Sequence, residues 1–394
     1  MPNQLETLMP RIVARGLLHF RERAILPRLV NSSFSSDAAR RGDAIDVPVS
    51  SPVAVSDVTP GKTFTGNIPD TSISSVSITL DNWKRAAFYL TDDEMAKIES
   101  SADFIPMQMA EAIHALAGAV NQSIIDTHKL IAHGLGLPGE IPFQPMPSTI
   151  ADVKDWHGAT CAIQARRFLN KAAAPKTGRF AIIDYDMEAN ALGLPQFHDA
   201  DKAGSTSVPM EGEIGRKFGI DWFSSDLLPN AGNSVGEVAI TQTARAQAMT
   251  ITVNASHSNI NPGDSFVIKN DADQTVHRVK SVAASSNSAH SDITLHMPIG
   301  QALNTSHKVI FKPTHKVGLV LHRDAVALAM RPLSAAGLES GLNGQIMSVS
   351  DPQTGLSLRL EVTRQYKQTM WEFDVLWGVA MMRPELACVI YGDA

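Results

Sequence analysis

The sequence predicts an α+β fold in which a small all-β module interrupts a body of helices and strands. Three observations lead to this prediction. Apolar residues recur at helical spacing through residues 103–134. Apolar and polar residues alternate in several short runs near both ends of the chain. Residues 233–314 are rich in Ser, Asn, Thr and Gly, and turns separate their short alternating runs, which is typical of a β-barrel or sandwich.

Length and composition narrow the class of protein. The chain has 394 residues, 44% of them hydrophobic and 19% charged, which is a folding composition with room for two or three domains. The net charge of −6 argues against a protein whose whole surface clamps nucleic acid. Two cysteines exclude a disulfide scaffold and a CxxC zinc site. No apolar run reaches the ~18 residues of a membrane span, and the first residues lack the pattern of a secretory signal, so we expect a cytoplasmic chain without a membrane partner.

The first 41 residues form a basic segment. They contain seven arginines against three acidic residues. Apolar residues repeat roughly at helical spacing between Leu5 and Phe20, and Pro10 and Pro27 are expected to interrupt or bound the helix. Two interpretations stay open: an arm that grips a neighbouring subunit or an anionic partner, or an amphipathic helix whose charged face is solvated.

Residues 45–90 resemble a long hairpin. Ile45–Val49 alternates with a period of two, and so does Val76–Leu80, running on to Ala87–Leu90. Thr59–Asp70, between them, is rich in turn residues. Because two strands alone are marginally stable, the hairpin must pack on its own body or reach onto another chain.

The strongest helix prediction covers residues 103–134. Asp103 is a suitable N-cap, Pro106 sits in the first turn, and Gly134 ends the helix. The apolar stripe consists of Ala110, Ile113, Ala117, Val120, Ile124 and Ile131.

The remaining elements follow from the same patterns. A second helix is expected over 148–173, capped by Ser148 or Thr149, then a buried strand over 179–184 and a short helix over 187–192. Within the all-β module, strands are expected at 249–253, 266–269, 276–279, 293–297 and 309–311. A helical signal returns at 324–330, and strands are expected at 357–362, 373–382 and 386–391.

The chemical motifs in the sequence do not predict an active site. Gly134–Gly139 matches GxGxxG in letters, but it follows a helix and contains a proline, whereas dinucleotide binding needs a strand before the loop and a helix after it. His128 and His133 are five residues apart, which does not place two imidazoles on one helix face. Asp92–Glu94 is a better helix start than a metal site. We therefore expect no enzyme, no cofactor and no bound metal.

Three short segments carry a family resemblance. They are Trp377–Ala387, with its aromatic-Gly-Val and Arg-Pro-Glu pattern, the strand and helix start at Ala181–Asp186, and the turn at Asn261–Phe266. The layout is distinctive as well: a basic arm, a long hairpin, a long helix, an α/β block interrupted by the β insertion, and C-terminal strands. With these segments and this layout, the chain resembles the major capsid proteins of tailed bacteriophages, which have the Johnson (Hong Kong ninety-seven-type) fold. The likeness is greater to the phage P-twenty-two-like coat proteins, which carry an inserted β-barrel domain.

The resemblance implies a division into five parts. These are an N-terminal arm (1–45), an E-loop (46–90), a peripheral domain with a long spine helix (91–147 and 345–394), an axial domain (148–232 and 315–344) and an inserted β-barrel domain (233–314).

The resemblance also implies a function. The chain would self-assemble, as hexamers and pentamers, into the icosahedral shell of a virion that encloses packaged double-stranded DNA, after synthesis in the host bacterial cytoplasm. A portal would be a partner, and a decoration protein is a further candidate. The helix-then-hairpin layout starts almost at Met1, so a separate scaffolding protein is expected.

Some contact residues follow from the same resemblance. The hypothetical subunit-interface residues are Arg11, Arg15, Lys62, Thr63, Phe64 and Asn67. The hypothetical inner-face or scaffold contacts are Arg21 and Arg23. Lys62 stands where some members of the wider fold form an isopeptide cross-link to an Asn, but residues 345–394 contain no Asn, so we expect no cross-link.

Three other functions remain as alternatives. One is an encapsulin-like bacterial compartment shell, although such chains are usually shorter and lack the insertion. Another is a soluble hydrolase with a β accessory module, which should show a convergent set of acid, base and nucleophile. The third is a phage tail or decoration protein, against which the 103–134 helix argues.

Overall fold

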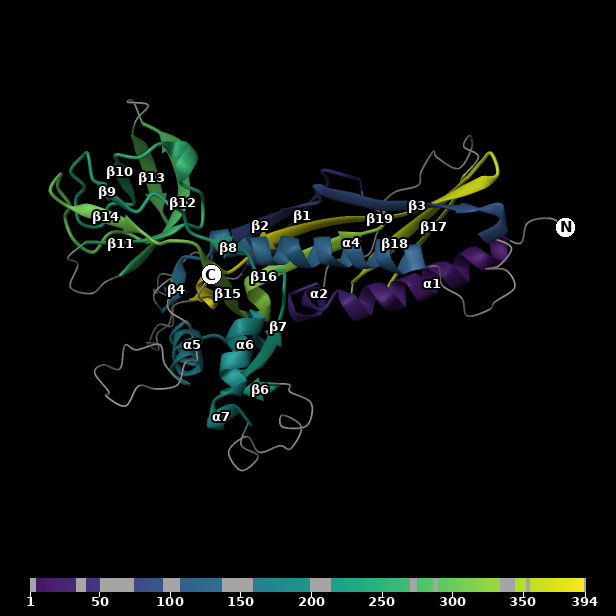
Figure 1. Cartoon of the computed structure of the whole chain (residues 1–394), viewed down its shortest axis with the longest axis horizontal. Helices are drawn as coiled ribbons and strands as arrows, with labels where there is room; N and C mark the ends of the chain where they lie inside the picture. The colour runs from purple at the N-terminus through teal and green to yellow at the C-terminus, as the bar shows by residue number, and fades with distance from the viewer. Residues whose placement is uncertain are drawn as a thin grey trace, which may run out of the picture. The chain divides into compact units, whose positions relative to one another are not determined.

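A computed structural model gives the fold of the chain (Figure 1). It describes residues 5–32, 40–49, 74–94, 107–136, 159–198, 214–269, 275–285, 290–333, 344–351 and 355–392. The described part is α+β, as predicted, and strands predominate in it. It divides into two compact units. Unit 1 comprises Met1–Arg23, Ser32–Ala117 and Ala327–Met382, and unit 2 comprises Ala24–Asn31, Gly118–Val326 and Arg383–Ala394.

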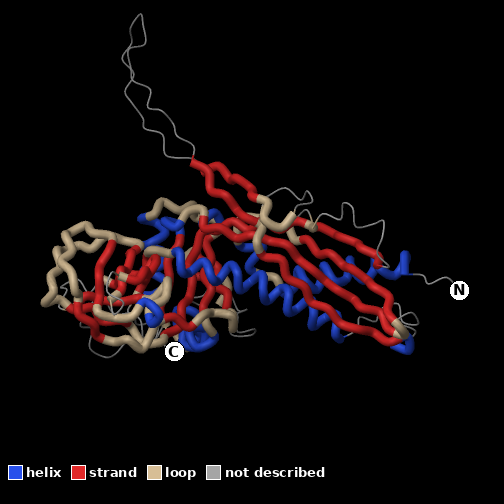
Figure 2. Tube along the Cα trace, turned by 90° about the horizontal axis from the view of Figure 1, so that it is seen from above, coloured by secondary structure: helices blue, strands red, loops and turns tan. Residues whose placement is uncertain are grey.

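Unit 1 is built on an antiparallel sheet of long strands, which lie side by side in Figure 2. The strand order is β16-β19-β18-β17, and β3 also pairs with β19. Their bounds are Asn82–Thr91 (β3), Val326–Arg331 (β16), Gly344–Ser350 (β17), Ser357–Gln365 (β18) and Gln368–Met381 (β19). Side chains alternate between two faces of the sheet. One face is apolar and includes the buried Leu358, Leu360 and Phe373.

Two helices pack on that apolar face. They are α1 (Leu5–Arg23) and the first part of α4 (Met107–Ile125). A Cβ at Gly16 of α1 would lie 3.1 Å from Ile113 of α4 and 3.3 Å from Leu358 of β18, so the glycine permits a close approach. The expected interruption at Pro10 is wrong, because α1 continues through it. Packing of the following turns, where Val13 is buried, compensates for the one hydrogen bond that proline removes.

The predicted hairpin is confirmed at its base. β1 (Ala44–Val49) pairs antiparallel with β2 (Ser74–Thr79). Ile78 and Leu80 are buried against Leu376 in a cluster on unit 1. The expected continuation through 87–90 is wrong, since these residues belong to β3 and pair with β19. The tip, 59–70, lies outside the described residues.

The long helix is shorter than predicted. α4 ends at Ile125 and continues as the 3₁₀ turn η1 (Asp126–Leu130), and Gly134 lies in strand β4 (His133–Leu135) rather than at a helix end. The Oγ1 of Thr127 donates to the carbonyl of Ile124 (2.7 Å), and the Nδ1 of His128 lies 3.1 Å from the carbonyl of Ile125. These two side chains therefore form polar contacts with the carbonyl groups at the C-terminal end of α4. Asp103 and Pro106 lie outside the described residues.

Unit 2 contains a seven-stranded mixed sheet in the order β4-β20-β15-β5-β7-β6, with β8 paired to β15. The bounds are Arg179–Ile183 (β5), Arg216–Lys217 (β6), Ile220–Ser224 (β7), Asn230–Ala231 (β8), His315–His322 (β15) and Ala387–Tyr391 (β20). Besides the end of α4 from Gly118, the described helices of unit 2 include α2 (Leu26–Leu29), α5 (Thr160–Lys171), α6 (Tyr185–Leu192) and α7 (Pro195–His198). The buried strand over 179–183 and the helix that follows are confirmed. Ser148 and Thr149 lie outside the described residues.

Helices α5 and α6 cover one face of this sheet. Phe168 of α5 packs on His133 of β4, with ring centroids 5.0 Å apart. A Cβ at Gly318 of β15 would lie 3.6 Å from the sulfur of Met187 in α6. His133 and Gly318 pair with β20 residues that are two apart, so the side chain of His133 and a Cβ at Gly318 lie on the same face.

The strands of the all-β module form a closed barrel. The order is β10-β13-β12-β11-β14-β9. The bounds are Glu237–Ala239 (β9), Thr250–Val253 (β10), Ser265–Ile268 (β11), Val276–Ala284 (β12), Ser291–Leu295 (β13) and Lys308–Phe311 (β14), with a 3₁₀ turn η2 at His257–Asn259. Hydrogen bonds from Asn254 N to Ala239 O (3.0 Å) and from Thr241 N to Thr252 O (2.9 Å) join the two end strands. Apolar side chains fill the interior.

One predicted helix is a strand. Residues 324–330 lie in the 3₁₀ turn η3 (Arg323–Ala325) and in β16. Val326–Met330 is buried throughout and pairs with β19. The periodicity of such a short apolar run is ambiguous, so pairing in the sheet determines that it forms a strand rather than a helix. The predicted C-terminal strands are confirmed as β18, β19 and β20, and η4 (Pro384–Leu386) precedes β20.

Candidate assembly surfaces

Five of the six residues predicted at a subunit interface cannot be located on a surface. Lys62, Thr63, Phe64 and Asn67 lie outside the described residues. Arg11 belongs to α1, but its side chain is outside the described part. Their role stays a prediction.

The other predicted arginines lie along α1, within unit 1. Arg15 is half-buried, and Arg23 is exposed at the end of the helix. Arg21 Nη1 lies 3.6 Å from Oδ2 of Asp351, just after β17. The structure therefore places these three residues on one helix and gives Arg21 an acidic partner within the same chain.

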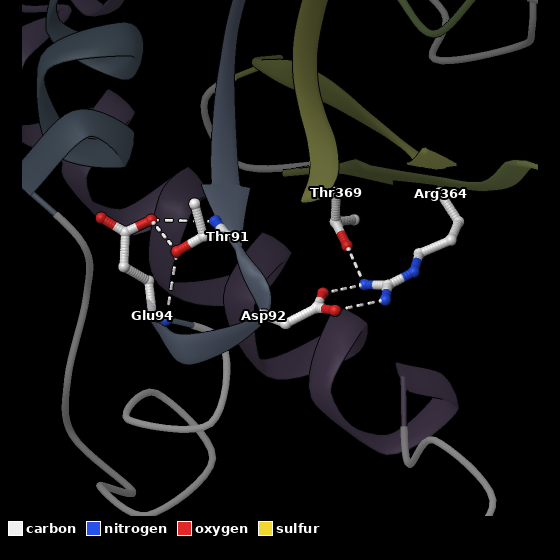
Figure 3. A network of polar contacts seen from close by, with 5 residues as sticks. All are labelled: Thr91, Asp92, Glu94, Arg364 and Thr369. Carbon is white, nitrogen blue, oxygen red and sulfur yellow. Dashed lines mark hydrogen bonds and ion pairs between the residues drawn. The ribbon is translucent and has the colours of Figure 1, made fainter. Parts of the chain in front are cut away.

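The end of the unit 1 sheet is held by a polar network (Figure 3). The side chain of Glu94 accepts hydrogen bonds from the backbone N–H and the hydroxyl of Thr91, at 2.8 and 2.9 Å. The backbone N–H of Glu94 donates to the hydroxyl of Thr91 at 3.5 Å, which completes a capping box. Arg364 donates two hydrogen bonds to the carboxylate of Asp92 (2.5 and 2.9 Å) and one to Thr369 (3.0 Å). The segment Asp92–Glu94 thus opens a helix, as the sequence predicted, and Arg364 ties it to the β18–β19 hairpin.

The polar face of the same sheet bears a grid of charged side chains. Arg359, Asp374 and Arg85 are direct cross-strand neighbours on β18, β19 and β3. Glu361 and Glu372 form the next row. Arg359 Nη2 donates to Glu361 (3.0 Å), and its Nε lies 3.6 Å from Asp374. Arg85 Nη1 donates to Glu372 at 3.1 Å. Three carboxylates therefore face two guanidinium groups.

Sequence reasoning missed this grid. The signal was present in the alternation of charged and apolar residues along Arg359–Glu361 and Glu372–Asp374. Burial raises the pKa of Asp374 to about 6, while Arg359 and a hydrogen bond from Trp83 oppose the rise. Glu372 and Glu361 add repulsion. The carboxyl group of Asp374 thus changes its protonation within the physiological range.

Exposed aromatic side chains accompany the grid on β3. Trp83 and Tyr89 point to the same face of the strand, and they are 46% and 53% exposed. Tyr366, in the turn between β18 and β19, is 85% exposed. Within the described residues, β3 pairs with β19 on one edge only. Exposed Trp and Tyr beside Arg85 are the residue types that dominate protein interfaces.

The barrel is attached to the rest of unit 2 through buried polar contacts. Arg278 of β12 is 1% exposed and donates to the carbonyls of Ile131 (3.0 Å) and Gly263 (3.2 Å). The hydroxyl of Ser265 on β11 donates to the hydroxyl of Tyr391 on β20 (3.0 Å). These bonds hold the barrel against the residues after η1 and against the last strand.

The described residues offer no obvious catalytic or metal chemistry. They contain no group of three or more His, Cys, Asp or Glu side chains placed to hold a metal ion. Burial, and secondarily the charge of Arg278, lowers the pKa of His128 to about 4, so this histidine is neutral at pH 7. Both cysteines, Cys161 and Cys388, are buried, and burial raises their thiol pKa values. Among the described helices, none combines the length and hydropathy of a membrane span.

Comparison with known proteins gives matches among solved structures only. No family model and no curated protein matches the sequence. A structure described as Mycobacterium phage Che8 matches at 14% identity and a TM-score of 0.46, covering 93% of this chain and 90% of the other. The capsid structure of the cyanophage P-SCSP1u matches at 15% identity and a TM-score of 0.46, covering 93% and 87%. A virus-like particle from Pyrococcus furiosus matches at 7% identity and a TM-score of 0.40, covering 97% and 98%.

Two of these matched structures are described as a capsid and as a virus-like particle.

Proposed function

We propose that the chain is the major capsid protein of a tailed double-stranded DNA bacteriophage. In this role it is a structural subunit without enzymatic activity. Many copies, arranged as hexamers and pentamers, form an icosahedral shell around the packaged genome. A separate scaffolding protein and a portal complete the assembly.

The observation that carries this proposal is the order of the elements. The basic helix α1 comes first, followed by the β1–β2 hairpin and α4. The strands and helices of unit 2 follow, the barrel of β9–β14 interrupts them, and strands β17–β20 end the described chain. This is the order implied by the resemblance of Trp377–Ala387 and the two other segments to the capsid family.

The finer assignments belong to the same proposal. Residues 1–45 would be the N-terminal arm, and 46–90 the E-loop that lies on a neighbouring subunit. Residues 91–147 with 345–394 would form the peripheral domain, 148–232 with 315–344 the axial domain, and 233–314 the inserted domain. A two-stranded hairpin has little core of its own, which suits an arm that gains its burial from a neighbour.

Sedimentation velocity and negative-stain imaging test the proposal. The purified chain is measured alone and after co-expression with the proteins encoded beside it. Closed shells of megadalton mass are expected in at least one condition, and shells that need a neighbouring protein would identify the scaffold. Stable monomers in both conditions would contradict the proposal.

Two further measurements test the assigned contacts. Denatured shells should give single-subunit bands, because residues 345–394 lack the Asn that a cross-link from Lys62 would need. Ladders of linked subunits would contradict this. Reversing the charges of Arg11 and Arg15 should impair assembly or packaging. Normal shells filled with DNA would contradict the assignment of these two residues to a subunit interface.

A further inference from the structure

The seven-stranded sheet of unit 2 carries opposite charge at its two ends. Exposed cations from α5, the following loop, β6 and η3 gather where β5 begins, and we name this set the basic end. Its members are Arg166, Arg167, Lys171, Lys176, Arg216 and Arg323. Carboxylates gather where β5 and β7 finish, and we name this set the acidic end. Its members are Asp184, Asp186, Glu188 and Asp226.

Hydrogen bonds between elements hold the basic end together. Arg216 Nη2 on β6 donates to the carbonyl of Lys176 (3.3 Å), and the backbone N–H of Arg323 donates to the carbonyl of Gly178 (2.8 Å). Arg179, the first residue of β5, donates through Nη1 to the side chain of Asn170 in α5 (2.8 Å). Three separate segments therefore present their cations on one rim of the sheet.

The four carboxylates of the acidic end also lie close together, around the last residue of β5. Asp184 directly follows β5, and Asp186 and Glu188 lie in the first turn of α6. The backbone N–H of Ser225 donates to the carbonyl of Ile183 (3.0 Å), which places the adjacent Asp226 beside the end of β5.

Each end keeps an excess of its own sign among the described residues. Asp221 lies 3.7 Å from Nε of Arg216, and Asp324 lies 3.6 Å from Nδ1 of His322. Six cations therefore stand beside two carboxylates. At the other end, Lys316 Nζ lies 4.0 Å from Asp184, so one ammonium stands beside four carboxylates.

The two ends do not neutralise each other within one copy. β5 has five residues, and a strand rises ~3.3 Å per residue, so its ends are separated by about 13 Å. This exceeds the Debye length of ~8 Å at physiological ionic strength. Among the described residues, neither end therefore neutralises the other at close range, and the matching end of a second copy offers the opposite charge.

We infer that the basic end of one copy contacts the acidic end of the next copy, head to tail. The inference rests on the proposed function and names a contact within the shell. A head-to-tail contact joins two different patches and closes into a ring when its rotation allows, whereas a two-fold contact repeats the same patch. Complementary patches also steer copies into register. Binding of the basic end to nucleic acid would leave the acidic end without a role.

Charge-swap variants test the contact. The basic-end variant is Arg167→Glu with Lys171→Glu, and the acidic-end variant is Asp186→Lys with Asp226→Lys; all four side chains are exposed. Each variant should slow shell assembly about tenfold or more at low salt, because it sets like charge against like. The four-fold variant restores opposite signs and should assemble within about threefold of the unchanged chain. Assembly is followed by light scattering and sedimentation, and thermal melting confirms that each variant folds.

A matched control separates the contact from net charge. Arg245→Glu with Lys280→Glu changes the exposed barrel surface by the same charge as the basic-end variant. Combined with the acidic-end variant, it restores the net charge without restoring the contact, so assembly should stay slow. Recovery in this control would overturn the inference.

The remaining outcomes are distinct. Normal assembly of a folded basic-end variant, or no recovery in the four-fold variant, would refute the contact. Normal shells that retain less DNA would assign the basic end to nucleic acid instead, which also overturns it. If the unchanged chain forms no shells, the proposed function fails. The contact is then tested by mixing the basic-end and acidic-end variants, and sedimentation without any hetero-association would refute it.

Discussion

Replacing Asp374 with asparagine should change how the stability of the unit 1 sheet depends on pH. Asp374 is 3% exposed and lies between Arg359 and Arg85 on neighbouring strands. Its pKa is raised from 3.8 to about 6, with burial as the largest cause. The folded sheet therefore binds a proton that the unfolded chain releases at lower pH.

The sign follows from linkage. Because the folded pKa of Asp374 lies above the unfolded value, its contribution to stability is fully present below pH 3.8 and is lost as the pH rises through about 6. Between pH 5 and pH 7 this loss amounts to about 1.3 kcal/mol in the free energy of unfolding, because 2.303RT is about 1.36 kcal/mol per pH unit. Asp374→Asn cannot titrate, so its stability should fall less over this range by that amount.

Urea unfolding of the unassembled chain, followed by tryptophan fluorescence, measures the effect. Three of the five tryptophans, Trp83, Trp371 and Trp377, lie in the unit 1 sheet and report on it. Asp46→Asn, at an exposed site on β1, is the matched control and should keep the pH dependence of the unchanged chain. Equal slopes for Asp374→Asn and the unchanged chain would refute the titration of Asp374 in this window.

Three further substitutions test the packing. Arg278→Met removes the donor to the carbonyl of Ile131 and should lower the free energy of unfolding of unit 2 by about 2–4 kcal/mol in urea titration; an unchanged midpoint would contradict the buried attachment of the barrel. Gly378→Ala places a Cβ 2.2 Å from the carbonyl oxygen of Thr79, so the strand must shift, and thermal melting should show a loss of about 1–3 kcal/mol. Gly118→Ala meets nothing within 4 Å in helix α4 and should instead stabilise the chain by about 0.5–1 kcal/mol, which a lowered melting temperature would contradict.

Local periodicity predicted most of the strands correctly. Val76–Leu80 and Ser357–Val362 alternate with a period of two, and each forms a strand at those residues or within one or two of them. The same holds for the apolar stripe from Ile113 to Ile124, which forms the buried side of α4. These patterns are readable because one face of each element is buried and the spacing of that face is set by backbone geometry.

The errors occurred where long-range contacts outweighed local pattern. Residues 324–330 have a helical composition, but pairing with β19 makes Val326–Arg331 a strand. Residues 87–90 extend a hairpin in sequence, yet β3 pairs with β19, nearly three hundred residues away. Pro10 marks a break by propensity, but packing on the sheet carries α1 through it. Backbone hydrogen bonds can be satisfied in more than one way, and the surrounding sheet selects among them.

The candidate surfaces likewise combine features that the sequence predicts with groupings that only the structure reveals. The sequence by itself determined the α+β class, the basic N-terminal segment, the all-β module and the capsid resemblance, because composition, periodicity and short motifs are properties of neighbouring residues. Only the tertiary structure placed Arg359 and Asp374 beside Arg85, or collected Arg166, Arg216 and Arg323 on one rim of a sheet. Those groupings depend on which strands pair, and strand pairing joins residues far apart in the chain.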